Sequence, residues 1–186
     1  MFEVDAAIKP ASPAPVACTL PLEIEPILLD AVIRGTREGL EMTGLNPPPI
    51  GASRYCTASR AISVVVGLVG RTNGSVTLSM GERTMLHIAS KLLGEEHHSI
   101  DEMTFDAIGE VGNMIGGRVK EVLIGTPYES ENISVPSVIM GQSYNVHYTR
   151  GMHTLSVDFE LTDMPFNDLK ERFFTTSLAL LRRVSG

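Results

Sequence analysis

Residues 106–121 read DAIGEVGNMIGGRVKE, and they combine regularly spaced apolar residues with four glycines. Apolar residues recurring every three or four positions predict an amphipathic α-helix that packs on a sheet. The spacing of Ser99 and Glu102 predicts a capping box at its start, and Gly125 and Pro127 predict its end. On the side opposite the apolar face, the helix would carry a narrow polar stripe of Asp106, Glu110, Asn113, Gly117 and Lys120.

The four glycines of this helix need a reason, because each costs about 1 kcal/mol relative to alanine in a helix interior. Gly109, Gly112 and Gly116 share one flank of the helix, where we expect another backbone or strand to pack closely. Gly117 lies within the polar stripe beside Asn113. Its missing side chain would leave space for a visiting molecule.

Elements on both sides of this helix follow from hydrophobic periodicity and turn residues. Before it we expect a helix at 26–43, β-like runs at 51–57 and 61–69, a strand at 75–79 after the Asn73-Gly74 turn, and a helix that starts with a Ser79/Glu82 capping box and ends at Gly94. After it we expect strands at 133–141, 144–149 and 152–161, and a final helix capped by Asn167 and carrying Leu169, Phe173, Leu178, Leu181 and Val184.

The strand expected at 152–161 alternates apolar Leu155, Val157 and Phe159 with polar Ser156, Asp158 and Glu160. One face of the sheet should therefore pack on the core, while the other contacts water or a partner. Together with the order of elements, this predicts an α/β (α+β) fold, in which long helices pack on one face of a mostly antiparallel sheet.

The composition limits the class of protein. The chain has 186 residues, of which 43% are hydrophobic, and its formal net charge is −7. We expect a flexible leader at 1–21 and a single domain at 22–186. The acidic balance argues against a nucleic-acid partner, and no apolar run is long enough to predict a membrane span. Cys18 and Cys56 are too few for a disulfide framework, so we expect inert thiols and a cytoplasmic location.

Glu110 and Asn113 are the candidate functional pair. Residues three apart on a helix present their side chains side by side, here a carboxylate and a carboxamide. A carboxylate can pair with a lysine, and an amide can orient a water molecule in line with a phosphoryl group. Such a pair also occurs on exposed helix faces as solvated side chains without a function. The spacing alone does not distinguish a functional pair from a non-functional one.

The segment resembles the signature of the CheC/CheX/FliY family of chemotaxis phosphatases. In that signature Asp or Ser is followed at fixed intervals by Glu, Asn and Pro, and Asp106, Glu110, Asn113 and Pro136 satisfy every interval. The resemblance covers about 60–161. It implies hydrolysis of the aspartyl phosphate on a response-regulator receiver domain such as CheY.

By this resemblance, Asn113 would orient the attacking water and Glu110 would form a salt bridge with the receiver's lysine. Asp106, Gly117 and Pro136 would have supporting roles. The receiver would supply its own Mg²⁺, so we expect no cofactor and no metal site in this chain. The family relation also predicts a homodimer.

Some relatives carry two such helices by internal duplication. In the helix at 26–43 the same register gives Asp30, Arg34 and Arg37, and Arg60 stands where the proline would fall. Arginines in place of Glu and Asn suggest a decayed second site. This pattern favours the CheX branch, whose members resemble it in keeping one working helix.

Two other functions remain open. A binding or scaffold module of a chemotaxis, flagellar-switch or two-component complex would keep the fold without turning its partner over, and a small-molecule binder is a third possibility. We expect His97, His98, His147 and His153 to be surface residues rather than metal ligands. The methionines, including Met80, Met85, Met103 and Met114, are expected to fill the core.

Overall fold

The structure is a computed structural model and describes residues 24–54, 60–141, 144, 148, 151–164 and 171–181. It contains three α-helices within these residues, α1 (Pro26–Gly39), α2 (Glu82–Leu93) and α3 (Glu102–Val122), and a short 3₁₀ helix η1 (Glu41–Thr43). The leader expected at 1–21 lies outside the described residues, as does most of the strand expected at 144–149. No described helix is both long and apolar enough to cross a membrane.

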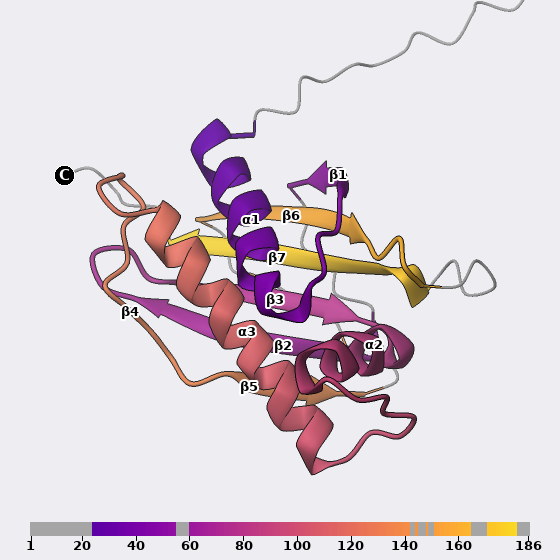
Figure 1. Cartoon of the computed structure of the whole chain (residues 1–186). Helices are drawn as coiled ribbons and strands as arrows, with labels where there is room; N and C mark the ends of the chain where they lie inside the picture. The colour runs from indigo at the N-terminus through magenta and orange to yellow at the C-terminus, as the bar shows by residue number, and fades with distance from the viewer. Residues whose placement is uncertain are drawn as a thin grey trace, which may run out of the picture.

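The strands form one antiparallel sheet in the order β1-β6-β7-β3-β2-β4, and β5 also pairs with β2. Their bounds are β1 Pro49–Ser53, β2 Ile62–Val69, β3 Gly74–Met80, β4 Asn132–Ile133, β5 Ser137–Met140, β6 Met152–Glu160 and β7 Phe173–Leu181. Helices α1 and α3 lie side by side across one face of the sheet, and α2 lies near one end of α3 (Figure 1). The predicted fold class is therefore confirmed.

The predicted final helix is wrong. Its capping residue Asn167 lies outside the described residues, and 173–181 form the central strand β7, which pairs with β3 and β6. Phe173, Leu178 and Leu181 match helical spacing, but this segment is also rich in aromatic and β-branched residues, which favour strands. Because most of β7 is buried on both faces, its sequence lacks the strict alternation that identifies a half-exposed strand.

Neither predicted capping box is present: α3 is capped by a different pair of residues, and α2 has no side-chain cap. The N-cap of helix α3 is Asp101, whose carboxylate accepts a hydrogen bond from the Thr104 backbone N–H at 2.9 Å, while the Thr104 hydroxyl accepts from the Asp101 N–H. The hydrogen bond from the Thr104 backbone N–H lowers the pKa of the Asp101 carboxyl. Helix α2 begins at Gly81 without a side-chain cap, and the Ser79 hydroxyl instead bonds to the hydroxyl of Ser63 in the neighbouring strand.

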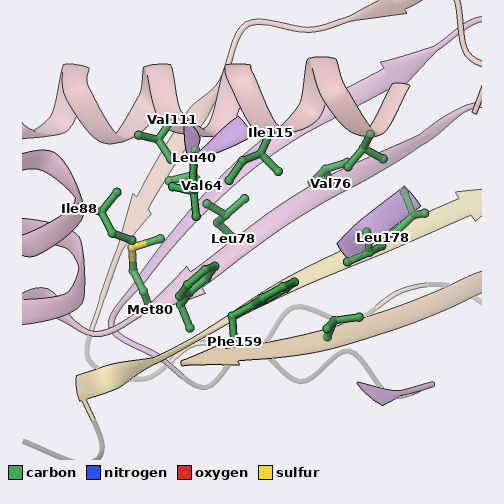
Figure 2. Close-up of a cluster of buried hydrophobic side chains, with 14 of the residues drawn as sticks. Leu40, Val64, Val76, Leu78, Met80, Ile88, Val111, Ile115, Phe159 and Leu178 are labelled. Carbon is green, nitrogen blue, oxygen red and sulfur yellow. The ribbon is translucent and has the colours of Figure 1, made fainter. Parts of the chain in front are cut away.

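The hydrophobic core lies between the helices and the sheet, with side chains of α3 facing those of β2 and β3 (Figure 2). Its largest fully buried side chains include Phe159 and Phe174, whose rings stack with centroids 5.3 Å apart. Leu155, Val157 and Phe159 point into this core, as their alternation predicts. The opposite side is less exposed than expected, because Ser156 is buried and its hydroxyl lies 2.8 Å from that of Ser177.

The closest approach between helices uses glycines of α1. A Cβ atom on Gly39 would lie 2.7 Å from the Cα of Ile115, and one on Gly35 would lie 2.8 Å from the backbone nitrogen of Val119. Such distances are too short for any side chain, so the backbones of α1 and α3 are in direct contact. This contact fixes α3 against a second helix as well as against the sheet.

The close packing predicted for three glycines of α3 is confirmed for two of them. Gly112 and Gly116 pack closely on the sheet, since a Cβ would lie 2.5 Å from a methyl of Val64 and 2.9 Å from one of Val66, respectively. Gly109 has room for a methyl group, because the nearest described atom would be 3.9 Å away. Close packing therefore explains two of the three flanking glycines.

Candidate functional site

The polar stripe of α3 faces away from the core. Asp106 and Glu110 are exposed, while Asn113, Gly117 and Lys120 are half-buried. The opposite side of the helix, including Ile108, Val111 and Ile115, is fully buried against the sheet. The amphipathic pattern thus places the predicted pair on an accessible surface, supported by a rigid core.

Glu110 and Asn113 lie side by side, as their spacing predicts. The Asn113 Nδ2 donates a hydrogen bond to the Glu110 Oε2 at 3.5 Å, a long and weak contact. An amide that donates in this direction presents its oxygen as an acceptor. The pair therefore offers a carboxylate and an amide oxygen on the same side of the helix.

Gly117 leaves space beside this pair. Apart from the backbone of α3 itself and the two neighbouring residues, no described heavy atom would lie within 4 Å of a Cβ at Gly117. The residue stands one helical turn beyond Asn113, so a side chain there would lean back over the amide. Farther along the stripe, Lys120 is directed to the backbone carbonyl of Glu131 at 3.4 Å.

Pro136 lies in the segment that follows α3, between the edge strands β4 and β5. Ile133 is paired with Leu68 and Ser137 with Val65, so the three residues 134–136 of this segment lie opposite the two residues 66 and 67 of β2. This extra residue makes a β-bulge, and a proline is tolerated there because it has no N–H to contribute to the ladder. Pro136 therefore interrupts the edge strand, and the single strand expected at 133–141 is divided into β4 and β5. Its supporting role at the site stays a prediction.

Helix α1 repeats the geometry of α3 without its chemistry. Its buried residues Leu28, Ala31, Val32, Gly35, Thr36 and Gly39 have the same spacing as Thr104, Ala107, Ile108, Val111, Gly112 and Ile115 of α3. Arg34 and Arg37 consequently occupy the exposed positions that correspond to Glu110 and Asn113.

The two arginines of α1 are engaged with neighbours. Arg34 lies 3.4 Å from Asp30 and 3.3 Å from Glu38, and Arg37 donates to the side chain of Asn46 at 2.6 Å. Glu41 takes the position that corresponds to Gly117. This surface does not carry the Glu–Asn pair, and the decayed second site stays a prediction.

The histidines occupy several environments. His98 is exposed, as expected, and His147 lies outside the described residues. His97 and His153 are only partly exposed, so they are more shielded from solvent than expected. The ring of His153 contacts Tyr128 edge to face, and its Nδ1 lies 3.7 Å from the Glu25 carboxylate. Among the described residues, no three His, Cys, Asp or Glu side chains are grouped in a way that could hold a metal.

Sequence reasoning missed an apolar surface next to Glu110. Met80 and Met85 are buried as predicted, and Met114 is half-buried, but Met103 is 52% exposed. It lies near Leu92 and Leu93 at the end of α2, and these residues line an open groove that also includes Glu110. Helical periodicity assigns Leu92, Leu93 and Met103 to apolar helix faces. It does not reveal that these side chains line an open groove between α2 and α3.

Comparison with known proteins identifies this architecture. A family model described as "Chemotaxis phosphatase CheX" matches residues 62–160. The CheX structure from Desulfovibrio desulfuricans superimposes with a TM-score of 0.69 at 25% identity and covers 82% of this chain and 98% of that one. The CheX–CheY–BeF₃–Mg²⁺ complex from Borrelia burgdorferi gives a TM-score of 0.65 at 26% identity and covers 84% and 96%, respectively.

A curated relative, the CheY-P phosphatase CheX of Thermotoga maritima, is 30% identical over 89 residues, or 46% of this chain. The matched segment spans 56% of the length of that relative. The fold is that of the CheC/CheX-like chemotaxis proteins. Because the family model covers more than half of the sequence, the chain belongs to the CheX family of chemotaxis phosphatases.

Proposed function

We propose that this protein hydrolyses the aspartyl phosphate of a CheY-like receiver domain and that Glu110 and Asn113 are its catalytic pair. The observation that carries the proposal is the accessible Glu110–Asn113 pair on α3, in a chain of the CheX family. Two relatives support it, since one is named a CheY-P phosphatase and another is a complex with CheY, BeF₃ and Mg²⁺.

The reaction needs a water molecule to attack the phosphorus atom while the bond to the aspartyl oxygen breaks. The products are inorganic phosphate and a free carboxylate. One proton of the water stays on the attacking oxygen, which becomes part of the phosphate, and the other passes to a phosphate oxygen or to solvent. Phosphoryl transfer depends mainly on positioning and electrostatics, so one well-placed acceptor can contribute much of the catalysis. In the proposal Asn113 accepts a hydrogen bond from the water and holds it in line.

Glu110 would bind rather than react. An exposed carboxylate next to Asn113 can pair with a lysine near the phosphorylated aspartate of the receiver, and this pairing would bring the amide to the phosphorus. The receiver would supply the Mg²⁺ that neutralises the phosphoryl oxygens. Asp106, Gly117 and Pro136 would shape the surface, with Gly117 providing access to the Asn113 amide.

The proposal is tested by the decay of phosphate from purified, labelled receiver domains of the CheY type. We expect Asn113→Ala to lower kcat about 100-fold with little change in KM, because a misplaced water loses its alignment. We expect Glu110→Gln to raise KM by about 30-fold or more, the effect of losing one partner of an interfacial ion pair. Both variants should fold normally, since neither side chain belongs to the core.

Arg37→Ala provides the matched control, because Arg37 occupies the corresponding position on α1. Its dephosphorylation rate should equal that of the wild type. Full activity of Asn113→Ala would remove the catalytic role of the amide. Receiver binding by the wild type without any shortening of the phosphoryl lifetime would instead identify a scaffold module and overturn the enzymatic proposal.

A further inference from the structure

An open groove of about 670 Å³ lies beside Glu110, between the last turn of α2 and the first half of α3. Its apolar lining consists of Leu92, Leu93, Met103 and Ala107. Met103 and Leu93 are 52% and 36% exposed, respectively, and both are large side chains that cost free energy to leave in water.

The charged groups that line this groove all have the same sign. They are Asp101, Glu102, Asp106 and Glu110, which follow one another along the exposed side of α3. Apolar side chains bordered by four carboxylates match a partner surface with an apolar side chain flanked by lysine or arginine. An acidic or purely polar partner would be repelled or would leave the apolar residues uncovered.

The groove and the catalytic pair share Glu110. Met103 lies two helical turns before Glu110, about 10 Å along the axis. A stable protein interface covers about 800 Å² on each partner, which corresponds to a disc about 16 Å in radius. A receiver centred on Glu110 and Asn113 would therefore cover the groove as well.

We propose that this groove is the specificity subsite of the phosphatase and that it docks an apolar side chain, flanked by basic residues, on the receiver surface next to the phosphorylation pocket. The inference rests on the proposed function. Docking here selects the receiver, and the apolar groove residues Leu92, Leu93 and Met103 take no part in the chemical step. Loss of docking should therefore raise KM and leave kcat unchanged.

The test compares two exchanges of an exposed apolar residue for lysine. Met103→Lys places a positive charge in the acidic groove, where it opposes a basic partner. Ile124→Lys makes the same change just beyond the other end of α3, where the side chain is 61% exposed. We expect Met103→Lys to raise KM at least tenfold with unchanged kcat, and Ile124→Lys to resemble the wild type.

Binding of the receiver loaded with Mg²⁺ and BeF₃⁻ gives a second readout that does not require hydrolysis. Met103→Lys should raise Kd by the same factor, and the wild-type Kd should rise with salt concentration because the attraction is partly electrostatic. Leu93→Lys repeats the test from the other wall of the groove, and circular dichroism checks that each variant is folded.

The outcomes separate this inference from the proposed function. Wild-type KM and Kd for both groove variants, with activity still lost in Asn113→Ala, would overturn the groove and leave the phosphatase in place. A fall in kcat at constant KM in Met103→Lys would also overturn it. Binding without hydrolysis by the wild type would overturn the phosphatase, and the Kd values of the groove variants would then decide whether the subsite exists.

Discussion

Substitution of Gly117 should move stability and activity in opposite directions. Gly117 lies inside α3, and no described atom outside the neighbouring backbone of the helix would contact a Cβ placed there. Alanine is better than glycine in a helix interior by about 1 kcal/mol, so Gly117→Ala should stabilise the protein by that amount. For a chain of this size the gain corresponds to a rise of about 2 to 4 °C in the midpoint of thermal unfolding.

The same position controls access to Asn113. Side chains on a helix lean toward its N-terminus, so a side chain at 117 lies over the turn that carries Asn113. A methyl group should reduce receiver dephosphorylation only slightly, whereas Gly117→Leu should reduce it tenfold or more by covering the amide. Leucine has nearly the helix propensity of alanine, so Gly117→Leu should still be more stable than the wild type.

Urea unfolding and phosphate decay, measured on the same preparations, test both halves of this expectation. Gly112→Ala is the control for stability, because its methyl would lie 2.5 Å from a methyl of Val64 in a closely packed interface. Overpacking of that kind costs about 1 to 3 kcal/mol and should cancel or exceed the gain in helix propensity. Wild-type dephosphorylation by Gly117→Leu, or a loss of stability in Gly117→Ala, would refute the reasoning.

Two further predictions concern the support of α3. Gly39→Ala should lower the free energy of unfolding in urea by about 1 to 3 kcal/mol. Its Cβ would lie 2.7 Å from the Cα of Ile115, so α1 and α3 would have to separate. An unchanged urea midpoint would contradict the direct backbone contact between the two helices. Asp101→Ala should lower the thermal midpoint by about 2 to 4 °C at pH 7 through loss of the cap. The hydrogen bond from Thr104 lowers the folded-state pKa of Asp101, so its contribution is present above the unfolded pKa and is lost as the pH falls through the folded pKa. The difference between Asp101→Ala and the wild type should therefore shrink in acid, and a difference of unchanged size below both pKa values would argue against an ionised cap.

The sequence was most informative where one spacing of apolar and polar residues extends over a long segment. The polar and apolar residues of α3 repeat with helical spacing over its whole length, so its buried face, its polar stripe and the pairing of Glu110 with Asn113 could all be predicted. Gly117 could also be predicted to be open, because its stripe contains no apolar residue to pack on it. Each of these features depends on local geometry alone.

Features that depend on tertiary neighbours could not be predicted in this way. The sequence of β7 does not distinguish a strand from a helix, because most of β7 is buried on both faces and such burial removes the alternation that marks a strand. The capping residue of α3 was displaced by two positions, since Ser99 and Asp101 both suit a cap and only the fold selects between them. The contact through Gly35 and Gly39 was missed because its partner residues lie in another helix.

The same buried spacing in α1 and α3 explains why one helix can carry the proposed site while the other need not. Both helices present a matching face to the core, so their packing is independent of the residues on their outer surfaces. Arg34 and Arg37 can therefore replace a Glu–Asn pair without loss of stability, and they find partners within their own surface. In α3 the outer residues meet few such constraints, and a groove with acidic walls adjoins them. Catalysis by positioning requires a rigid support more than a reactive group. The backbone contact between α1 and α3 gives this support to α3, the helix that carries Glu110 and Asn113.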